Sequence, residues 1–156
     1  MSTMKSKAPW TADRLERLSD EKAYEIDGGT LVKRTMGVES SWIGGQILVL
    51  LHEFCRANKL GWVFGMDNGF QCWTDDPTRL RRPDVSFVSF HRYSGKLPSR
   101  GFLPNAVDVI SPGERAAKIA RKRDQLLAAG VRLIWIVCAA ILTGASTATI
   151  SRRACA

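Results

Sequence analysis

The chain has 156 residues, which is enough for one domain with a core of its own. Hydrophobic residues make up 45% of it and charged residues 24%, as in ordinary soluble globular proteins, and this composition excludes a low-complexity chain. A net charge of +8 and an isoelectric point near 9.7 favour a polyanionic partner, with nucleic acid first and an anionic membrane surface second.

The first half of the chain predicts a hairpin between two helices. Residues 11–18 are expected to form a short amphipathic helix. In the stretch 24–32, YEIDGGTLV, two short strands flank a Gly-Gly pair that can supply the positive φ angles of a tight hairpin. Ser40 is then placed to cap a helix that runs to about Asn58. Apolar residues recur in this helix at the spacing of one buried stripe: Ile43, Ile47, Leu50, Leu51 and Phe54.

The second half predicts strands around one further helix. Strands are expected, in chain order, at residues 62–64, 69–73, 84–89, 106–110 and 131–137. The sequence Ser111-Pro112-Gly113 begins a helix, and Gly130 lies just past its end. This order of elements predicts a mixed α/β fold in which helices flank a central sheet.

The apolar stretch 133–142, LIWIVCAAIL, is too short for a membrane-spanning helix, which needs about 20 predominantly apolar residues. We therefore predict a buried central strand and no membrane association. The basic amino-terminal stretch has no apolar run behind it, so no signal peptide is expected. The cysteines lie far apart without a C-x-x-C pair, which argues against a zinc site and favours a reduced, cytoplasmic setting: Cys55, Cys72, Cys138 and Cys155.

Two aspartates occupy comparable places in neighbouring predicted strands. Asp84 opens one strand directly after Arg-Arg-Pro, and Asp108 lies inside the next, in AVDVI. A charged residue within an apolar strand is unfavourable by several kcal/mol unless something pairs with it. Two carboxylates on adjacent strands can chelate Mg²⁺, which prefers oxygen ligands and can activate water for attack on a phosphodiester. The alternative is that Asp84 caps a turn and Asp108 faces solvent on an edge strand.

The helix after Pro112 carries a basic face. Arg115, Lys118 and Lys122 follow the i, i+3, i+7 spacing, which places them on one side of the helix. Such a face can contact the phosphates of nucleic acid, and its alternative is a solvated basic surface.

Five motifs occur in one order between about residues 20 and 137. Together they resemble the Uma-type family of putative restriction endonucleases, a bacterial branch of the PD-(D/E)XK nuclease superfamily. The segments that carry the resemblance are YEIDG at 24–28, GWVF at 61–64 with Asp67, Gly69 and Phe70, RPDV at 82–85, Ser111-Pro112, and LAAGVRLIW at 127–135.

The resemblance implies a restriction-endonuclease-like core and a hydrolase that cleaves DNA as a metal-dependent endodeoxyribonuclease. Asp84 matches the aspartate of the family's R-P-D-V motif, and Asp108 falls where the family usually has glutamate. Both are implied to hold Mg²⁺, with Mn²⁺ as a substitute. Lys122 matches a lysine in the helix that leads to A-A-G-V and is implied to stabilise the attacked phosphate. Arg82, Arg115 and Lys118 are candidates for contact with DNA, and a homodimer is compatible with cutting both strands.

An alternative to an active enzyme is a catalytically inactive, truncated descendant of the nuclease fold that at most binds DNA. Asp108 replaces a longer glutamate, and the family pattern ends after Val137, where the chain continues as CAAILTGASTATISRRACA. The expected organisation is an N-terminal segment at 1–19, the nuclease-like domain at 20–137, and a diverged or truncated tail at 138–156.

Overall fold

The computed structural model describes residues 3–4, 8–35, 37–73, 75–92, 105–110, 116–138 and 147–152. For residues 3–4, 105–110, 138 and 147–152 this description is of the backbone. In the described part of the chain, no helix is both long enough and apolar enough to cross a membrane.

A small antiparallel sheet forms at the amino-terminal end, in the order β1-β3-β2. The strands are β1 (Thr3–Met4), β2 (Tyr24–Asp27) and β3 (Thr30–Lys33), and they are accompanied by the short helix α1 (Ala12–Leu15) and the 3-10 turn η1 (Glu21–Ala23). Gly28 and Gly29 connect β2 to β3 with φ angles of 55° and 75°, which are unfavourable for residues with a Cβ. The predicted hairpin is therefore confirmed.

A five-stranded sheet forms the larger part of the fold, in the order β4-β5-β6-β7-β8. Its strands are β4 (Gly61–Phe64), β5 (Val85–Ser89), β6 (Asn105–Ile110), β7 (Leu133–Cys138) and β8 (Thr147–Arg152). Strands β6 and β7 are parallel and the other neighbours are antiparallel. Strand β8 pairs with β7 along its whole length, so part of the expected tail continues the sheet.

The strand predicted at residues 69–73 does not form. Only an isolated bridge occurs there, in which Phe70 and Arg81 exchange two backbone hydrogen bonds. The preceding residue, Leu80, bridges instead to Ile26 of β2. Because Leu80 and Arg81 thus pair with different segments, no continuous ladder extends along 69–73.

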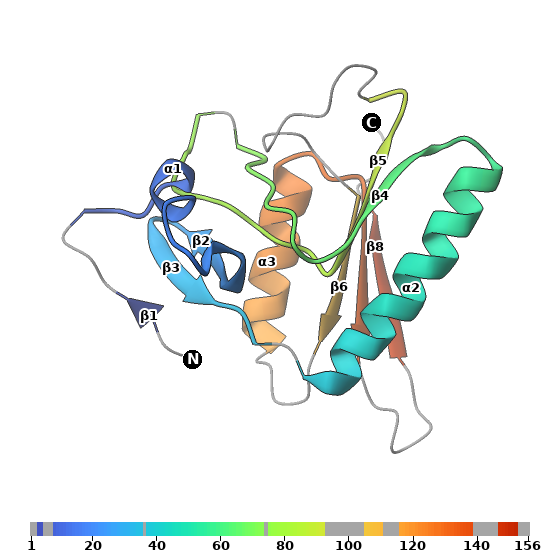
Figure 1. Ribbon diagram of the computed structural model, residues 1–156, viewed down its shortest axis with the longest axis horizontal. Helices are drawn as coiled ribbons and strands as arrows, with labels where there is room; N and C mark the ends of the chain where they lie inside the picture. The colour runs from blue at the N-terminus through green and yellow to red at the C-terminus, as the bar shows by residue number, and fades with distance from the viewer. Residues whose placement is uncertain are drawn as a thin grey trace.

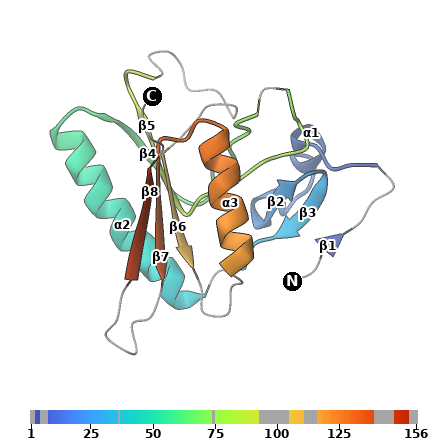
Figure 2. The same ribbon diagram turned by 180° about the vertical axis from the view of Figure 1, so that it is seen from behind.

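Two longer helices lie on opposite faces of the five-stranded sheet. The first, α2 (Val38–Ala57), packs against β4, β5 and β6, whereas α3 (Ala116–Ala128) connects β6 to β7 and packs against β7. Figures 1 and 2 show the sheet nearly edge-on between the two helices, with the β2–β3 hairpin beyond α3. Gly130 follows α3 with a φ of 95°, as expected for a glycine that ends a helix. A parallel pair joined by a helix and flanked by antiparallel strands is the predicted mixed α/β fold.

Helix α2 differs from its prediction in its start and in its buried face. It begins at Val38 after Gly37, and Ser40, the predicted cap, is buried inside the first turn. Small side chains face the sheet, since Gly44 and Cys55 are also buried, and they let the helix approach closely. Leu50 and Phe54 are 67% and 59% exposed, so the prediction of one buried stripe was wrong for these two residues.

Two clusters of buried residues lie in the described core. One joins α1, the hairpin and the strand-like segment before β5, through Trp10, Ala12, Leu15, Tyr24, Ile26, Leu31 and Leu80. The other lies between α3 and β7, through Leu126, Val131, Ile134 and Ile136. The segment Arg81-Arg82-Pro83, which follows Leu80 of the first cluster and leads to β5, is also buried, so charged groups lie inside the fold.

Candidate functional site

The register between β5 and β6 determines where the two predicted metal ligands lie. Val85 pairs with Val107 across this antiparallel pair. Continuing the register by one position sets Asp84, which directly precedes β5, opposite Asp108. Residues directly opposite each other in such a pair have Cα atoms about 4.5–5.5 Å apart. The backbone therefore brings the two aspartates together.

The carboxylate of Asp84 is held by Arg34. The guanidinium Nη2 of Arg34 lies 3.3 Å from Oδ1 of Asp84, and the two side chains are only 15% and 12% exposed. Arg34 follows β3 and is anchored by a second hydrogen bond, in which its Nη1 donates to the carbonyl of Met66 at 3.0 Å. The ion pair thus connects the end of the hairpin to the start of β5.

Lys122 of α3 faces the hairpin and binds Glu25 of β2. Its Nζ lies 3.2 Å from Oε1 of Glu25, with side-chain exposures of 20% and 8%. The same oxygen accepts a hydrogen bond from the backbone N–H of Arg82 at 2.8 Å. A half-buried ammonium is therefore positioned by a buried carboxylate, which also binds the backbone of Arg82, two residues before Asp84.

Glu25 stays ionised despite its burial. Desolvation by burial would raise the pKa of its carboxyl, but the positive charges of Lys122 and Arg81 and the N–H of Arg82 outweigh this effect. Together with the charge of Arg34 they lower the pKa from 4.5 to about 2. Arg34 also forms the ion pair with Asp84. Its charge therefore acts on both carboxylates, Glu25 and Asp84.

A second acidic residue of β2 extends this network along α3. Asp27 lies two positions after Glu25 and therefore on the same face of the strand. Arg81 bridges both residues, at 3.4 Å to Glu25 and 2.9 Å to Asp27. Asp27 also accepts from Nε2 of Gln125 at 3.2 Å and pairs with Arg121 at 3.3 Å. The hairpin and α3 are thus joined by charged groups on their facing sides.

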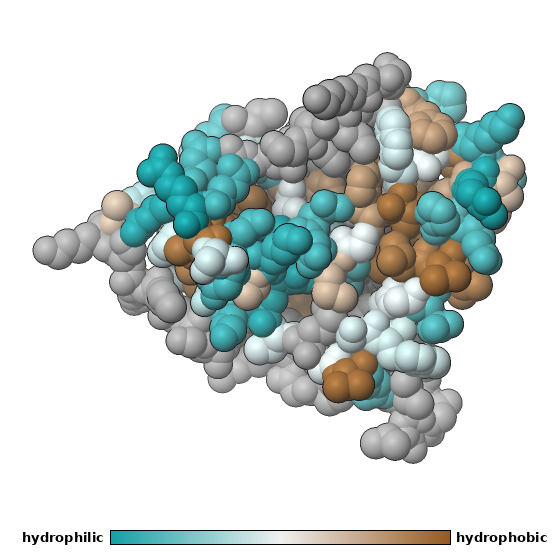
Figure 3. Space-filling model, viewed as in Figure 1, coloured by the Kyte–Doolittle hydropathy of each residue, from teal (hydrophilic) through white to brown (hydrophobic). Residues whose placement is uncertain are grey.

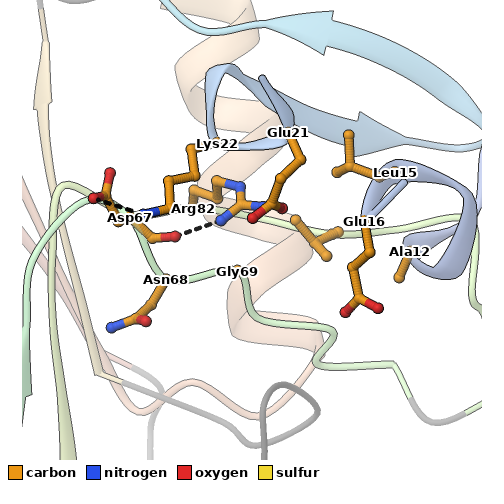
Figure 4. A pocket seen from close by; sticks show the side chains of 10 residues that line it. Ala12, Leu15, Glu16, Glu21, Lys22, Asp67, Asn68, Gly69 and Arg82 are labelled. Atoms are coloured by element: carbon orange, nitrogen blue, oxygen red, sulfur yellow. Dashed lines mark hydrogen bonds and ion pairs between the residues drawn. The ribbon is translucent and has the colours of Figure 1, made fainter. Parts of the chain in front are cut away.

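Arg82 lies in the same segment but turns toward a separate cavity. Its side chain is 4% exposed, and its guanidinium donates to the carboxylate of Glu21 and to the carbonyl of Asp67. A cavity of about 360 Å³ lies beside it, with Glu16 and Lys22 also in its wall. Figure 4 shows Arg82 between Glu21 and Asp67 on one side of this cavity. The guanidinium predicted to contact DNA is engaged by protein groups in this arrangement.

The structure places the remaining predicted DNA contacts as follows. Lys118 is exposed on α3, one turn before Lys122. Arg115 lies outside the described residues, as do the side-chain contacts of Asp108. Contact of these residues with nucleic acid stays a prediction.

Sequence reasoning missed Glu25, Asp27, Arg34, Arg81 and Gln125 as members of the site. The detectable signal was the pair Glu25 and Asp27 in YEID, because two acidic residues at positions i and i+2 share one face of a strand whose other residues are apolar. Their partners on α3 follow about a hundred residues later, and nothing in the local sequence indicates that the helix packs there.

The donor set suits an oxygen-ligated divalent cation. Asp84 and Asp108 would supply carboxylates from adjacent strands, and such ligands are those that Mg²⁺ and Mn²⁺ prefer. Among the residues whose side chains are described, no group of three or more His, Cys, Asp or Glu could hold a metal ion. A cation site here therefore depends on the Asp84–Asp108 pair.

Comparison with known proteins bears on the fold and the family. Residues 12–144 match the Uma2 family, which is described as "Putative restriction endonuclease". A solved structure of a putative nuclease belonging to DUF820 from Anabaena variabilis is similar with a TM-score of 0.67 and 18% identity, over 83% of this chain and 74% of that chain. No curated protein matches. The similarity confirms the predicted restriction-endonuclease-like fold class, and the match over most of the chain shows that this protein belongs to the Uma2 family.

Proposed function

We propose that the protein is a DNA endonuclease that hydrolyses phosphodiester bonds with a divalent cation. In this proposal Asp84 and Asp108 are the metal ligands, and Lys122 stabilises the negative charge on the attacked phosphate. The observation that supports it most is the β5–β6 register, which sets Asp84 opposite Asp108 in a member of a nuclease family.

The cation would be Mg²⁺, with Mn²⁺ as a substitute. Bound by the two aspartates, it would activate water and offset the charge of the phosphate. The structure supports the choice through the donor chemistry, since carboxylates on two adjacent strands are hard oxygen ligands.

Lys122 is suited to its proposed role by its charge and its anchoring. The carboxylate of Glu25, 3.2 Å from Nζ, pairs with the ammonium and restricts its position. A positioned positive charge in a partly buried site stabilises a developing negative charge more strongly than one in water. Glu25 is then a positioning residue that acts through Lys122.

Arg34 has a comparable effect on Asp84. Its guanidinium pairs with the Asp84 carboxylate and fixes one of its oxygens, at 3.3 Å.

The experiment that tests the proposal is cleavage of supercoiled plasmid by the purified protein with Mg²⁺, with Mn²⁺ and with EDTA. We expect metal-dependent nicking by the wild type and its loss in Asp84→Asn and in Lys122→Met. Asp75→Asn, at an exposed turn position, is the matched control and should cut like the wild type. Metal-independent cutting, or equal cutting by all variants, would contradict the proposed site.

A second candidate function is a nuclease-like protein that binds DNA without cutting it. The Arg34–Asp84 ion pair favours it, because it already gives the Asp84 carboxylate a structural partner. In that case the folded protein leaves the plasmid uncut but slows its migration in a gel. The affinity of the protein for DNA then falls steeply as the salt concentration rises. Lys118→Ala should then reduce the slope of that salt dependence by about one.

A further inference from the structure

Helix α2 presents an unusual apolar row to solvent. Val38, Trp42, Leu50 and Phe54 are 91%, 59%, 67% and 59% exposed, and they follow each other at spacings of four or eight residues. Gln46, also exposed, occupies the missing position at the centre of the row. These five positions form one i±4n ridge along the helix surface. We call them the α2 row.

The α2 row is larger than the apolar patches of ordinary monomers. At their exposed fractions its four apolar side chains and the adjacent Val49, which is 53% exposed, offer on the order of 600 Å² of apolar surface. The largest such patch on a typical monomer is about 300–600 Å², and a standard interface buries about 800 Å² on each partner. The row together with its polar border is therefore about the size that a stable dimer requires.

This face is not needed by the fold of the chain itself. The opposite side of α2, with Ser40, Gly44 and Cys55, already packs on the sheet. Figure 3 shows hydrophobic side chains gathered at the surface over the middle of α2. A helix that is apolar on both sides normally lies between two partners.

We propose that the α2 row is the contact surface of a homodimer with a two-fold axis at Gln46. The row is symmetric about this residue, because Trp42 and Leu50 lie four positions to either side of it, and Val38 and Phe54 lie eight positions away. A two-fold axis there brings Trp42 of one copy against Leu50 of the other.

Two further features fit a second copy. A hollow of about 500 Å³, lined by Gly37, Val38, Ser41 and Trp42, lies where the axis brings Phe54 of the second copy. The amide of Gln46 is both donor and acceptor, so two copies can hydrogen-bond to each other on the axis. The exposed area of the row, the hollow opposite Phe54 and the paired amides therefore point to a second copy of this chain as the occupant.

The proposed dimer leaves the candidate nuclease site open. Helix α2 lies on the opposite side of the sheet from α3, which carries Lys122 (Figures 1 and 2). Two sites on one dimer agree with cleavage of both DNA strands, but the surface itself does not depend on the nuclease proposal.

Cysteine cross-linking tests the position of the axis. Gln46→Cys should form a covalent dimer with a short bis-maleimide, because the two copies of this position meet. His52→Cys, exposed on the same helix but outside the row and the hollow, is the matched control, and the wild-type chain measures the background from the native cysteines. Gln46→Cys that cross-links no better than His52→Cys would overturn the proposal.

Sedimentation velocity without DNA tests the association itself. We expect a dimer for the wild type and a dissociation constant raised on the order of thirtyfold or more for Leu50→Glu. Adding Trp42→Arg to that variant should recover part of the dimer, since opposite charges then meet across the axis. Ala128→Lys, an exposed charge addition on α3, should leave the dimer unchanged. A wild-type chain that stays monomeric at concentrations on the order of 100 µM would overturn the proposal.

Discussion

Replacement of Glu25 by glutamine should make the protein less stable in a pH-dependent way. The carboxyl has a pKa of about 2 in the folded protein, against its ordinary 4.5. At 1.36 kcal/mol per pH unit, this difference corresponds to about 3 kcal/mol of folding free energy at pH 7. The side chain is 8% exposed, so solvent screens its interactions only weakly.

The direction of the pH dependence follows from the lowered pKa. Because the folded-state pKa lies below the unfolded value, the stabilisation is present above about pH 4.5 and is lost as the pH falls toward 2. By pH 3 about 2 of the 3 kcal/mol should be gone. Glu25→Gln keeps the size and one acceptor oxygen of the side chain but removes this titration.

Urea unfolding of the wild type and of Glu25→Gln at pH 7 and at pH 3 measures the effect. We expect the difference in unfolding free energy between the two proteins to be about 3 kcal/mol at pH 7 and about 1 kcal/mol at pH 3. Glu53→Gln, at an exposed position of α2, controls for loss of a carboxylate and should stay within about 0.5 kcal/mol of the wild type. A gap that is equal at both pH values would refute the reasoning.

Two further predictions concern the hairpin and a buried thiol. Gly29→Ala should be destabilising by about 2–3 kcal/mol in urea unfolding, since φ is +75° and the new Cβ would lie 2.7 Å from that of Pro9. Gly28→Ala is the control: its φ is +55° but its Cβ would lie in open space, so we expect only the backbone strain of about 1 kcal/mol. Equal losses of stability in the two variants would contradict the expected clash with Pro9. Burial raises the pKa of Cys72 to about 12, so iodoacetamide at pH 8 should modify it only through unfolding. Peptide mass spectrometry measures the rate of labelling. If Cys72 is labelled as fast in the folded protein as in urea, the thiol is accessible and the prediction is wrong.

The order of elements was predictable from the sequence where local chemistry determines structure. The Gly-Gly pair at 28–29 requires positive φ angles, and Gly130 marks the end of α3, so both boundaries follow from backbone stereochemistry. The R-P-D-V motif likewise predicts a strand at Asp84, and β5 begins at the next residue, Val85.

The members of the site that escaped prediction depend on contacts between distant residues. Glu25 and Lys122 are separated by 97 positions, and an acidic residue in a four-residue strand is compatible with a solvated face. The buried face of α2 was not predicted for another reason. The helix is apolar on both sides, so its periodicity does not show which side meets the sheet, and the small residues Ser40, Gly44 and Cys55 lie there.

The most direct test of the central claim is binding of Mn²⁺ by the folded protein, followed by electron paramagnetic resonance of the free ion. This measurement needs no knowledge of the DNA sequence that is cut. We expect a Mn²⁺ site in the wild type that is lost in Asp84→Asn and kept in Asp75→Asn, with all three proteins folded by circular dichroism. Equal Mn²⁺ binding by the wild type and Asp84→Asn would contradict the assignment of Asp84 as a metal ligand.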